Sequence, residues 1–308
     1  MHISVVIPTY NNSFILSKTL EYFCNLQTEG NIEWEIIIVG NNCNDNTEEI
    51  VSSYKEKLPV KFVTEKRQGT SIAKNTGITN SSGTLIIFTD DDCHPSLNWL
   101  KIYWDVFCAN SGNLFLGGPV ISVFELSPPI DELLPYAPPS VVGLHYGNNQ
   151  KIISNAQYFI GANWACPRQA LDEVGCFDVD MGLVATEKTI KTGEETDLMD
   201  RLKANGYNGL YIPEAIVHHF VPTNKTTLKH IASRREAYIY FISLKEFREE
   251  KIRRIPKWLW KQLVNSWILW SLSKFTRENF AEKCIQYRCA VGRIRAASDT
   301  IKYFREQK

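Results

Sequence analysis

The stretch Ile3-Ser-Val-Val-Ile-Pro-Thr-Tyr-Asn-Asn12 decides how this chain is expected to fold. Its first half is a short apolar run rich in β-branched residues, which is typical of a buried strand, and its second half is polar. Similar apolar runs recur and alternate with amphipathic stretches. The expected strands are Ile3–Pro8, Glu35–Val39, Val60–Thr64 and Thr84–Phe88, and the expected helices lie near 13–26, 45–57, 70–79 and 96–109. This alternation predicts an α/β fold with a mostly parallel sheet and helices on both faces.

Polar residues follow each of these expected strands. The four polar segments are Pro8-Thr-Tyr-Asn-Asn12, Gly40-Asn-Asn-Cys-Asn-Asp-Asn-Thr47, Arg67-Gln-Gly69 leading into Ser71-Ile-Ala-Lys-Asn75, and Asp90-Asp-Asp92. Asn-rich turns are ordinarily only turns, so no single segment is decisive. In parallel sheets, however, ligands bind beyond the carboxyl ends of the strands. The repetition of polar segments at one sheet edge therefore predicts a single ligand site.

The acidic run Asp90-Asp-Asp92 is the sharpest feature of that edge. In a solvated loop the mutual repulsion of three carboxylates would cost little, whereas in a pocket they would need a cation. Carboxylate oxygens suit Mg²⁺ or Mn²⁺, which also bridges to phosphate oxygens and acts as a Lewis acid. Lys74 and Arg67 could add positive charge to a diphosphate bound by that metal, although a lysine or arginine is more often a surface cation.

The composition is that of an ordinary globular protein of 308 residues, 44% apolar and 22% charged, with room for one large domain and an appendage. The formal net charge is zero, but residues 251–308 carry +10 and residues 1–250 carry −10. A basic tail points to an anionic partner, either a membrane surface or a nucleic acid. The eight cysteines form no CxxC pair, so we expect reduced cysteines in a cytoplasmic protein and no zinc cluster. The chain opens in strand-like sequence without a signal-peptide pattern.

Eight sequence blocks resemble those of the family 2 glycosyltransferases, which have the Rossmann-like GT-A fold. The blocks are Val5–Asn12, Gly40–Asp45, Gly69 with Ala73–Asn75, Asp90–Asp92, Gly161–Trp164, Val174–Asp178, Gly193–Leu198 and Pro213–His219. Together they extend over about residues 3–240. The resemblance implies an inverting, Mn²⁺- or Mg²⁺-dependent enzyme that transfers a sugar from a nucleotide sugar to a glycan or lipid-linked acceptor. Surface polysaccharide or glycolipid synthesis is the implied setting.

The resemblance also implies roles for individual residues. Asp92 would bind the metal, Asp90 would touch the metal or the donor ribose, and His219 would complete the metal site, with His218 as its alternative. The residues implied to bind the donor are Pro8, Thr9, Tyr10, Asn11, Asn41, Asp45, Arg67, Gly69, Lys74, Asp90 and Asp91. The residues implied to lie near the sugar or acceptor are Gly161, Ala162, Asn163 and Trp164.

Two departures from the family pattern bear on the donor. Gly40 and Asn41 stand where the family usually has carboxylates, and an amide both donates and accepts hydrogen bonds. A UDP-sugar is the default donor, with GDP- and dTDP-sugars left open. Lys74 replaces the usual arginine, which keeps the charge but loses bidentate phosphate geometry.

The catalytic base is expected in the block Gly193-Glu-Glu-Thr-Asp-Leu198. Inverting transfer needs a group that takes the proton of the acceptor hydroxyl, and a carboxylate suffices. Glu195 aligns with the family's usual base, and Glu194 and Asp197 are the other candidates. Acidic residues in a first helical turn also stabilise the helix dipole without any chemistry. Trp164 would stack on a sugar or, equally, belong to the core.

We expect a catalytic domain at 1–225, with a nucleotide-binding half at 1–118 and an acceptor half at 119–225, and a basic helical region at 226–308. Residues 226–250 are expected to form one helix. The Trp-rich stretch Trp258–Leu272 contains Lys261, Gln262 and Asn265 and is too interrupted to cross a membrane.

Two locations remain open for this Trp-rich part. The segment 251–275 either lies in the lipid headgroup region, at the inner face of the cell membrane, or packs on the catalytic domain or another subunit of a homo-oligomer.

Three other classes of protein are disfavoured. An inactive nucleotide-sugar-binding protein would have lost the base or the metal site. A sugar nucleotidyltransferase would carry a Gly-rich, basic loop after the first strand, where this chain has Pro8–Asn12. A nucleic-acid binder would use the basic tail, and salt-sensitive binding to nucleic acid rather than to anionic vesicles would identify it.

Overall fold

The computed structural model describes residues 2–28, 32–110, 112–182 and 192–306. The chain forms two compact units. The first is made of Met1–Val123, Gly143–Thr186 and Glu194–Phe220, and the second of Phe124–Val142, Glu187–Gly193 and Val221–Lys308.

The first unit is built on an eight-stranded sheet in the order β3-β2-β1-β4-β9-β6-β10-β8. The strands are β1 Ile3–Thr9, β2 Trp34–Asn41, β3 Val60–Glu65, β4 Leu85–Phe88, β6 Leu114–Gly117, β8 Lys151–Ile152, β9 Trp164–Pro167 and β10 Asn208–Tyr211. Strands β1 to β4 pair in parallel, as do β6 and β10, whereas β9 runs antiparallel to both β4 and β6. The predicted α/β class with a mostly parallel sheet is confirmed.

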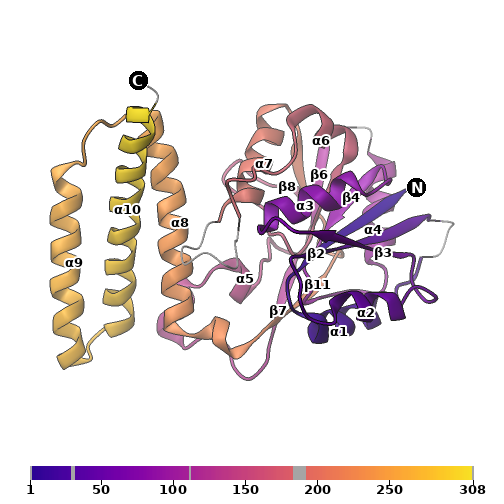
Figure 1. Ribbon diagram of the computed structural model, residues 1–308, viewed down its shortest axis with the longest axis horizontal. Helices are drawn as coiled ribbons and strands as arrows, with labels where there is room; N and C mark the ends of the chain where they lie inside the picture. The colour runs from indigo at the N-terminus through magenta and orange to yellow at the C-terminus, as the bar shows by residue number, and fades with distance from the viewer. Residues whose placement is uncertain (1, 29–31, 111, 183–191, 307–308) are drawn as a thin grey trace. The chain divides into compact units, whose positions relative to one another are not determined.

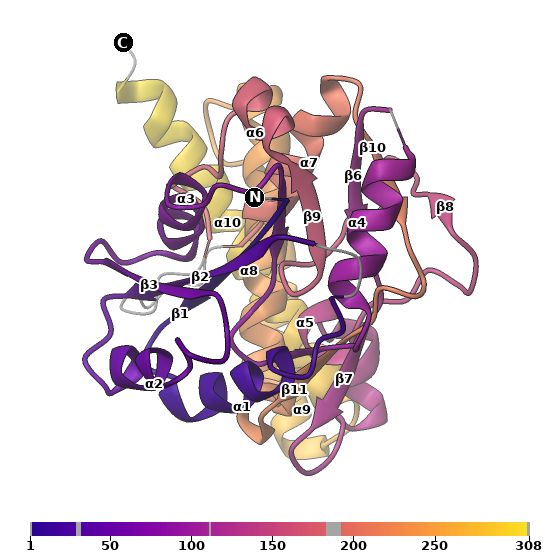
Figure 2. The same cartoon turned by 90° about the vertical axis from the view of Figure 1, so that its right-hand side faces the viewer.

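Helices cover both faces of this sheet. They are α1 Ser13–Phe23, α2 Thr47–Ser53, α3 Thr70–Thr79, α4 Trp99–Ala109, α6 Arg168–Val174 and α7 Glu194–Ala204. Side chains alternate along β1, so Val5 and Ile7 pack with α1, α2 and α4, while Val6 packs with α3, α6 and α7. Figure 2 shows α1 and α2 on one side of the first three strands and α3 on the other. The four strands and four helices predicted in this half are all present, with helix ends up to four residues shorter than expected.

A second, three-stranded sheet has the order β5-β11-β7. Its strands are β5 Cys93–Pro95, β7 Val120–Phe124 and β11 Val217–Val221. Strands β5 and β11 are antiparallel, with His219 opposite Cys93 and His218 opposite His94. This pairing brings residues 92 and 219 together although they are far apart in the sequence.

The second unit contains three long helices, α8 Leu228–Glu249, α9 Lys257–Thr276 and α10 Phe280–Glu306, of which α10 packs against both others (Figure 1). It also contains η1 Asp131–Tyr136, α5 Pro139–Val142 and η2 Thr223–Thr226. The expected helix at 226–250 is confirmed as α8. Helices α8 and α10 approach closely at Gly292, where a Cβ atom would lie 2.8 Å from the carbonyl oxygen of Glu236. Among the helices of the described residues, none has the length and apolar character needed to cross a membrane.

The packing of α3 on the sheet gives a first prediction. Gly77 of α3 faces β1, and a Cβ atom there would lie 2.3 Å from Cγ1 of Val6 and 3.3 Å from Cγ2 of Val39. We expect Gly77→Ala to lower the free energy of unfolding by about 1–3 kcal/mol, because a packed interior resists added volume. Urea denaturation followed by circular dichroism measures this change.

Gly112→Ala is the matched control, since a Cβ atom at Gly112 meets nothing within 4 Å. We expect this variant to stay within about 0.5 kcal/mol of the wild type. Equal urea midpoints for the Gly77 variant and the control would contradict the close contact of α3 with β1.

Candidate active site

The acidic run at 90–92 follows β4, and its middle residue, Asp91, is hydrogen-bonded to residues at the end of β1 and just after it. Asp91 Oδ2 accepts a hydrogen bond from Thr9 Oγ1 at 2.6 Å, and Asp91 Oδ1 accepts one from Asn12 Nδ2 at 2.9 Å. Thr19 Oγ1 of α1 donates to the carbonyl oxygen of Asp91 at 2.8 Å. Burial, together with the neighbouring charge of Asp92, raises the pKa of Asp91. Asp91 therefore holds the edge of the site in place.

The other two aspartates gather with a histidine. Ligand atoms of Asp90, Asp92, Cys93 and His219 all lie within 4.8 Å of one another, and Nε2 of His219 is 3.1 Å from Oδ1 of Asp92. Burial and the charge of Asp92 raise the pKa of Asp90, which is the electrostatic cost of two neighbouring buried carboxylates. Two carboxylates and an imidazole fit a divalent metal ion, which would remove that cost.

Cys93 contributes little to this donor set. Mg²⁺ and Mn²⁺ prefer carboxylate and other oxygen ligands, whereas a thiolate suits softer metals. The set that remains is the one expected from the sequence, Asp90, Asp92 and His219.

Strand pairing decides which histidine faces the aspartates. His218 and His219 are successive residues of β11, so their side chains point to opposite faces of the small sheet. His219 is buried beside Asp92, and its Nδ1 atom has no hydrogen-bond partner among the residues that the structure describes. His218 instead lies opposite His94. The structure thus favours His219 over its neighbour.

Lys74 is buried in α3 with its ammonium group between carboxylates. Its Nζ atom is ion-paired with Oε1 of Glu195 and lies 3.6 Å from Oε1 of Glu194. The ring of Phe177 lies beneath the same group, with its centroid 5.1 Å from Nζ. Burial alone would lower the pKa of Lys74, but the two glutamates outweigh it and raise that pKa. Lys74 therefore remains charged, with glutamates as its direct partners.

The two glutamates occupy the first turn of α7 and have different surroundings. Burial and the charge of Glu195 raise the pKa of Glu194, whose residue is 5% exposed. Burial also acts on Glu195, but the charge of Lys74 outweighs it and lowers the pKa of Glu195. The Glu195 side chain is 18% exposed, against 7% for Glu194. Glu195 is thus the member of the pair whose charged form Lys74 favours more, and it is the more accessible one.

Asp197 is held elsewhere. Its Oδ2 atom accepts a hydrogen bond from Nε of Arg201 at 2.9 Å, one turn further along α7. Arg201 also donates to the carbonyl oxygens of Val174 and Gly175. Asp197 thus stabilises the local structure of α7, as the alternative of acidic residues that stabilise the first helical turn predicted.

The segment expected near the sugar or acceptor divides into two parts. Gly161 abuts the glutamates, because a Cβ atom there would lie 2.4 Å from Oε1 of Glu195 and 3.2 Å from Nζ of Lys74. Asn163 instead joins several core elements. It accepts hydrogen bonds from Trp99 Nε1 and Tyr103 Oη and donates to the carbonyl oxygens of Pro119 and Ala215. Ala162 is buried and its carbonyl oxygen accepts from Thr89.

Trp164 lies in the core rather than on an open surface. The residue is fully buried, its ring stacks on Phe88 with centroids 4.8 Å apart, and the edge of Phe177 meets it. No ring face is left for a sugar, so the structure supports the packing alternative for Trp164.

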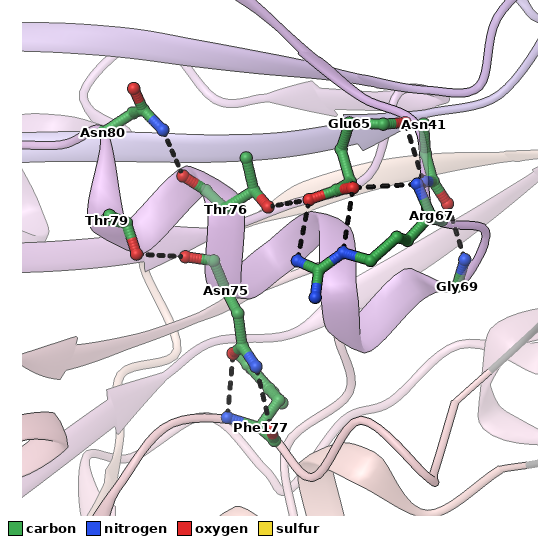
Figure 3. A network of polar contacts seen from close by, with 9 residues as sticks. All are labelled: Asn41, Glu65, Arg67, Gly69, Asn75, Thr76, Thr79, Asn80 and Phe177. Atoms are coloured by element: carbon green, nitrogen blue, oxygen red, sulfur yellow. Dashed lines mark hydrogen bonds and ion pairs between the residues drawn. The ribbon is translucent and has the colours of Figure 1, made fainter.

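Asn41, at the end of β2, holds the loop that leads into α3 (Figure 3). Its Oδ1 atom accepts from the backbone N–H of Gly69 at 2.8 Å, and its Nδ2 atom donates to the carbonyl oxygens of Arg67 at 2.6 Å and Glu65 at 3.3 Å. The amide thus uses its donor and its acceptor within the chain. Asn41 shapes the wall of the site and has little capacity left to bind a nucleobase.

Arg67 is a surface cation with a local partner. Its guanidinium group, 72% exposed, pairs with Glu65 at 3.1 Å, and Glu65 also accepts a hydrogen bond from Thr76 Oγ1 at 2.7 Å (Figure 3). The hydrogen bond from Arg67 lowers the pKa of Glu65 to about 2. A role for Arg67 at a diphosphate would require this pair to open.

The loops after β1 and β2 are joined to each other. Asn11 Oδ1 accepts from the backbone N–H of Asn44 at 2.8 Å. Asp45 accepts from the backbone N–H groups of Ser13 and Thr47, the first residues of α1 and α2. Pro8 and Thr9 end β1, and Tyr10 beside them is 38% exposed. The residues after β1 and β2 that were expected to bind the donor therefore lie at one edge of the sheet.

Sequence reasoning missed several residues that build the site. Asn12 and Thr19 fix Asp91, and Asn75 holds the backbone of Phe177 through paired hydrogen bonds of 2.8 and 2.9 Å (Figure 3). Asn12 and Asn75 belong to two of the sequence blocks that resemble the family, and this membership could have indicated that they are part of the site. Nothing in the sequence indicated Phe177 as a partner of Lys74.

Two family models match this chain. The model of glycosyl transferase family 2 matches residues 4–175, more than half of the chain, and that of glycosyl transferase family group 2 matches residues 142–283. The chain belongs to glycosyl transferase family 2. The resemblance drawn from the sequence blocks is confirmed, and the family's matched residues include the acidic run at 90–92.

The chain is also similar to curated proteins of known name. The chain is 24% identical over 322 residues to the chondroitin synthase of Pasteurella multocida strain Pm70, a match covering 92% of this chain and 31% of that protein. The chain spans between 17% and 33% of the length of the first curated relatives it matches.

Two solved structures of similar fold contain a bound nucleotide sugar. The mannosyltransferase PcManGT from Pyrobaculum calidifontis, in complex with GDP-Man and Mn²⁺, is 18% identical with a TM-score of 0.54 and covers 95% of this chain and 87% of its own. S. aureus TarS, in complex with UDP-GlcNAc, is 13% identical with a TM-score of 0.58 and covers 100% of this chain and 93% of its own. These likenesses concern the fold, and the expected GT-A fold is confirmed.

The buried ion pair gives a second prediction for this family 2 member. Lys74→Met leaves two buried carboxylates without their cation, so we expect a loss of about 3–5 kcal/mol in the free energy of unfolding. Adding Glu195→Gln should recover part of that loss, with a coupling energy of about 0.5–3 kcal/mol in a double-mutant cycle measured by urea denaturation.

The more accessible pair of Asp197 and Arg201, whose side chains are 28% and 30% exposed, is the control. Its cycle, Asp197→Asn with Arg201→Met, should give a coupling energy of at most about 1 kcal/mol, because solvent screens it. A cycle at Lys74 and Glu195 with no more coupling than this control would show that the buried pair does not form.

Proposed function

We propose that this chain is an inverting, metal-dependent glycosyltransferase that moves a sugar from a nucleoside-diphosphate sugar to a glycan or lipid-linked acceptor. One observation carries the proposal. Asp90, Asp92 and His219 come together at the carboxyl edge of the sheet, in the same unit as the pair of Lys74 and Glu195. A cation site and an ionised carboxylate are what such a transfer requires.

Asp92, Asp90 and His219 would hold Mn²⁺ or Mg²⁺. When bound, the metal supplies positive charge to the diphosphate of the donor. Mn²⁺ is present with GDP-Man in the complex of the similar mannosyltransferase, which supports this choice of ion. The chain's own residues shape the rest of the donor site: Asp91 fixes the strand edge, and the loops that contain Tyr10, Asn11 and Asp45 line it.

Glu195 is the proposed base. A carboxylate oxygen of Glu195 takes the proton of the acceptor hydroxyl while the hydroxyl oxygen bonds to the anomeric carbon. The bond from the anomeric carbon to the diphosphate breaks on the opposite side. The nucleoside diphosphate leaves with the bonding electrons, and the configuration inverts. A carboxylate of lowered pKa suffices, because the hydroxyl becomes acidic only as its new bond forms. Lys74 keeps Glu195 ionised and oriented.

The donor remains a UDP-sugar by default, with GDP- and dTDP-sugars as the alternatives. TarS binds UDP-GlcNAc and PcManGT binds GDP-Man, so the fold accommodates either base. The family relationship with a chondroitin synthase supports surface polysaccharide or glycolipid synthesis as the setting, on the cytoplasmic side of the membrane.

A third prediction concerns the donor. Each nucleotide sugar of a panel is incubated without acceptor, with Mn²⁺, Mg²⁺ or EDTA, and release of nucleoside diphosphate is measured. We expect slow hydrolysis of one donor, with loss of hydrolysis in EDTA and in Asp92→Ala. Failure of every donor to hydrolyse or to shift the melting temperature with metal would exclude a metal–diphosphate site.

A fourth prediction separates the acidic residues of α7. Glu195→Gln should lower kcat by about 10²–10⁴-fold, because a proton acceptor is lost, while the Kd of the donor measured by calorimetry stays near that of the wild type. Asp197→Asn, on the same helix and paired with Arg201, is the control and should retain activity within a few fold. A large loss of kcat in Asp197→Asn together with near-normal kcat in Glu195→Gln would identify Asp197 as the base instead.

A further inference from the structure

The long helix α9 packs on only one side. Leu259, Ser266 and Ser273 are buried and recur every seven residues, so they form one stripe along the helix. On the same side, Trp270 stacks on Tyr287 of α10 with ring centroids 4.8 Å apart. This stripe accounts for the contact of α9 with the rest of the helical unit.

The opposite side of α9 is apolar and exposed. We call this side the apolar face of α9. It consists of Trp260, Val264, Trp267, Ile268, Leu272 and Phe275, which are between 42% and 88% exposed. Spacings of three, four and seven residues place these side chains on one broad stripe. An amphipathic surface helix would carry polar residues on this side, so the pattern indicates a partner that covers it.

The charged residues of α9 itself have one sign. The helix contains no aspartate or glutamate, Lys257 is its first residue, and Lys261 lies within one turn of Val264. Lys274 is in its last turn, with its ammonium group over the ring of Trp270 at 3.8 Å. The segments that adjoin the two ends contain lysine or arginine at 251, 253, 254 and 277, with glutamate at 249, 250 and 278. A matching partner must therefore be both apolar and anionic.

A lipid bilayer with anionic headgroups has both properties. Tryptophan is favoured at the boundary of headgroups and acyl chains, and basic residues beside it are attracted to anionic lipid. Because α9 does not have the apolar character of a membrane-spanning helix, it would lie in the plane of the surface. A protein partner would cover the apolar side chains but would leave the single sign of charge unexplained.

We propose that the apolar face of α9 docks on the surface of an anionic lipid bilayer. The helix lies parallel to the membrane, with Val264, Ile268, Leu272 and Phe275 at acyl-chain level. Lys257 and Lys261 lie on the same side of the helix, in its first two turns, and their flexible stems let the ammonium groups reach the headgroups. This inference rests on the second unit alone and does not depend on the reaction carried out by the first.

The test uses the full chain and two kinds of vesicle. One contains only phosphatidylcholine, and in the other about a third of the lipid is phosphatidylglycerol. We expect the wild-type protein to sediment with the anionic vesicles and to be released by high salt. The triple variant Ile268→Gln, Leu272→Gln and Phe275→Gln should bind the anionic vesicles at least about tenfold more weakly, because it loses three membrane-inserted side chains.

Leu126→Gln with Ile130→Gln is the matched control. These two residues are 79% and 64% exposed but lie outside α9, so their replacement should leave sedimentation unchanged. Circular dichroism verifies that all variants are folded. Hydrolysis of the donor should be equal in the wild type and the triple variant, which keeps failure of docking distinguishable from failure of the proposed reaction.

Two outcomes would overturn the proposal. One is wild-type protein that stays in solution with anionic vesicles. If sedimentation velocity then shows a concentration-dependent dimer that the triple variant abolishes, the apolar face is an interface between two copies. The other is vesicle binding that the triple variant retains in full, which would assign the membrane contact to another part of the chain.

Discussion

The ammonium group of Lys74 lies out of reach of water, and the carboxylates of Glu195 and Glu194 replace that water. A buried charge without such partners would be severely destabilising. Lys74 belongs to α3 and the glutamates begin α7, so the pair fixes two helices that are distant in sequence. Gly161 leaves the space in which this contact forms. The direction in which Glu195 points is thus decided by a charge interaction with a helix on the nucleotide-binding side.

Successive aspartates of the acidic run at 90–92 have different partners, because neighbouring side chains of this segment point in different directions. Asp91 points toward β1, where Thr9 and Asn12 bind it, while Asp90 and Asp92 meet His219. The histidine arrives through the antiparallel register of β11 with β5. A shift of this register by one residue would present His218 in its place. The candidate metal site therefore depends on the small sheet as much as on the acidic residues themselves.

Some of this could be predicted from the sequence. The buried strands and the helices between them followed from apolar periodicity, and the acidic run and His219 followed from family blocks. Strand β5, with only three residues and a proline, has no such signal. Trp164 gave no sign of whether it would face a sugar or the core, because either environment suits an aromatic ring.

The partners of charged and polar side chains were the least predictable part. Lys74 and Glu195 are separated by 121 positions, and only the fold brings them together. In α9, Trp270 packs on α10 while Trp260 and Trp267 remain exposed, a division that depends on which neighbour the helix has. Periodicity shows that a face exists, but not what covers it.

The amide of Asn41 has a consequence for any attempt to change the donor. Where the family usually carries a carboxylate, this chain needs a group that donates at one atom and accepts at the other. A carboxylate at position 41 would set an oxygen against the carbonyl oxygens of Arg67 and Glu65. Residue 41 and the loop from Glu65 to Gly69 therefore form one unit, and a carboxylate at position 41 would require a change in that loop as well.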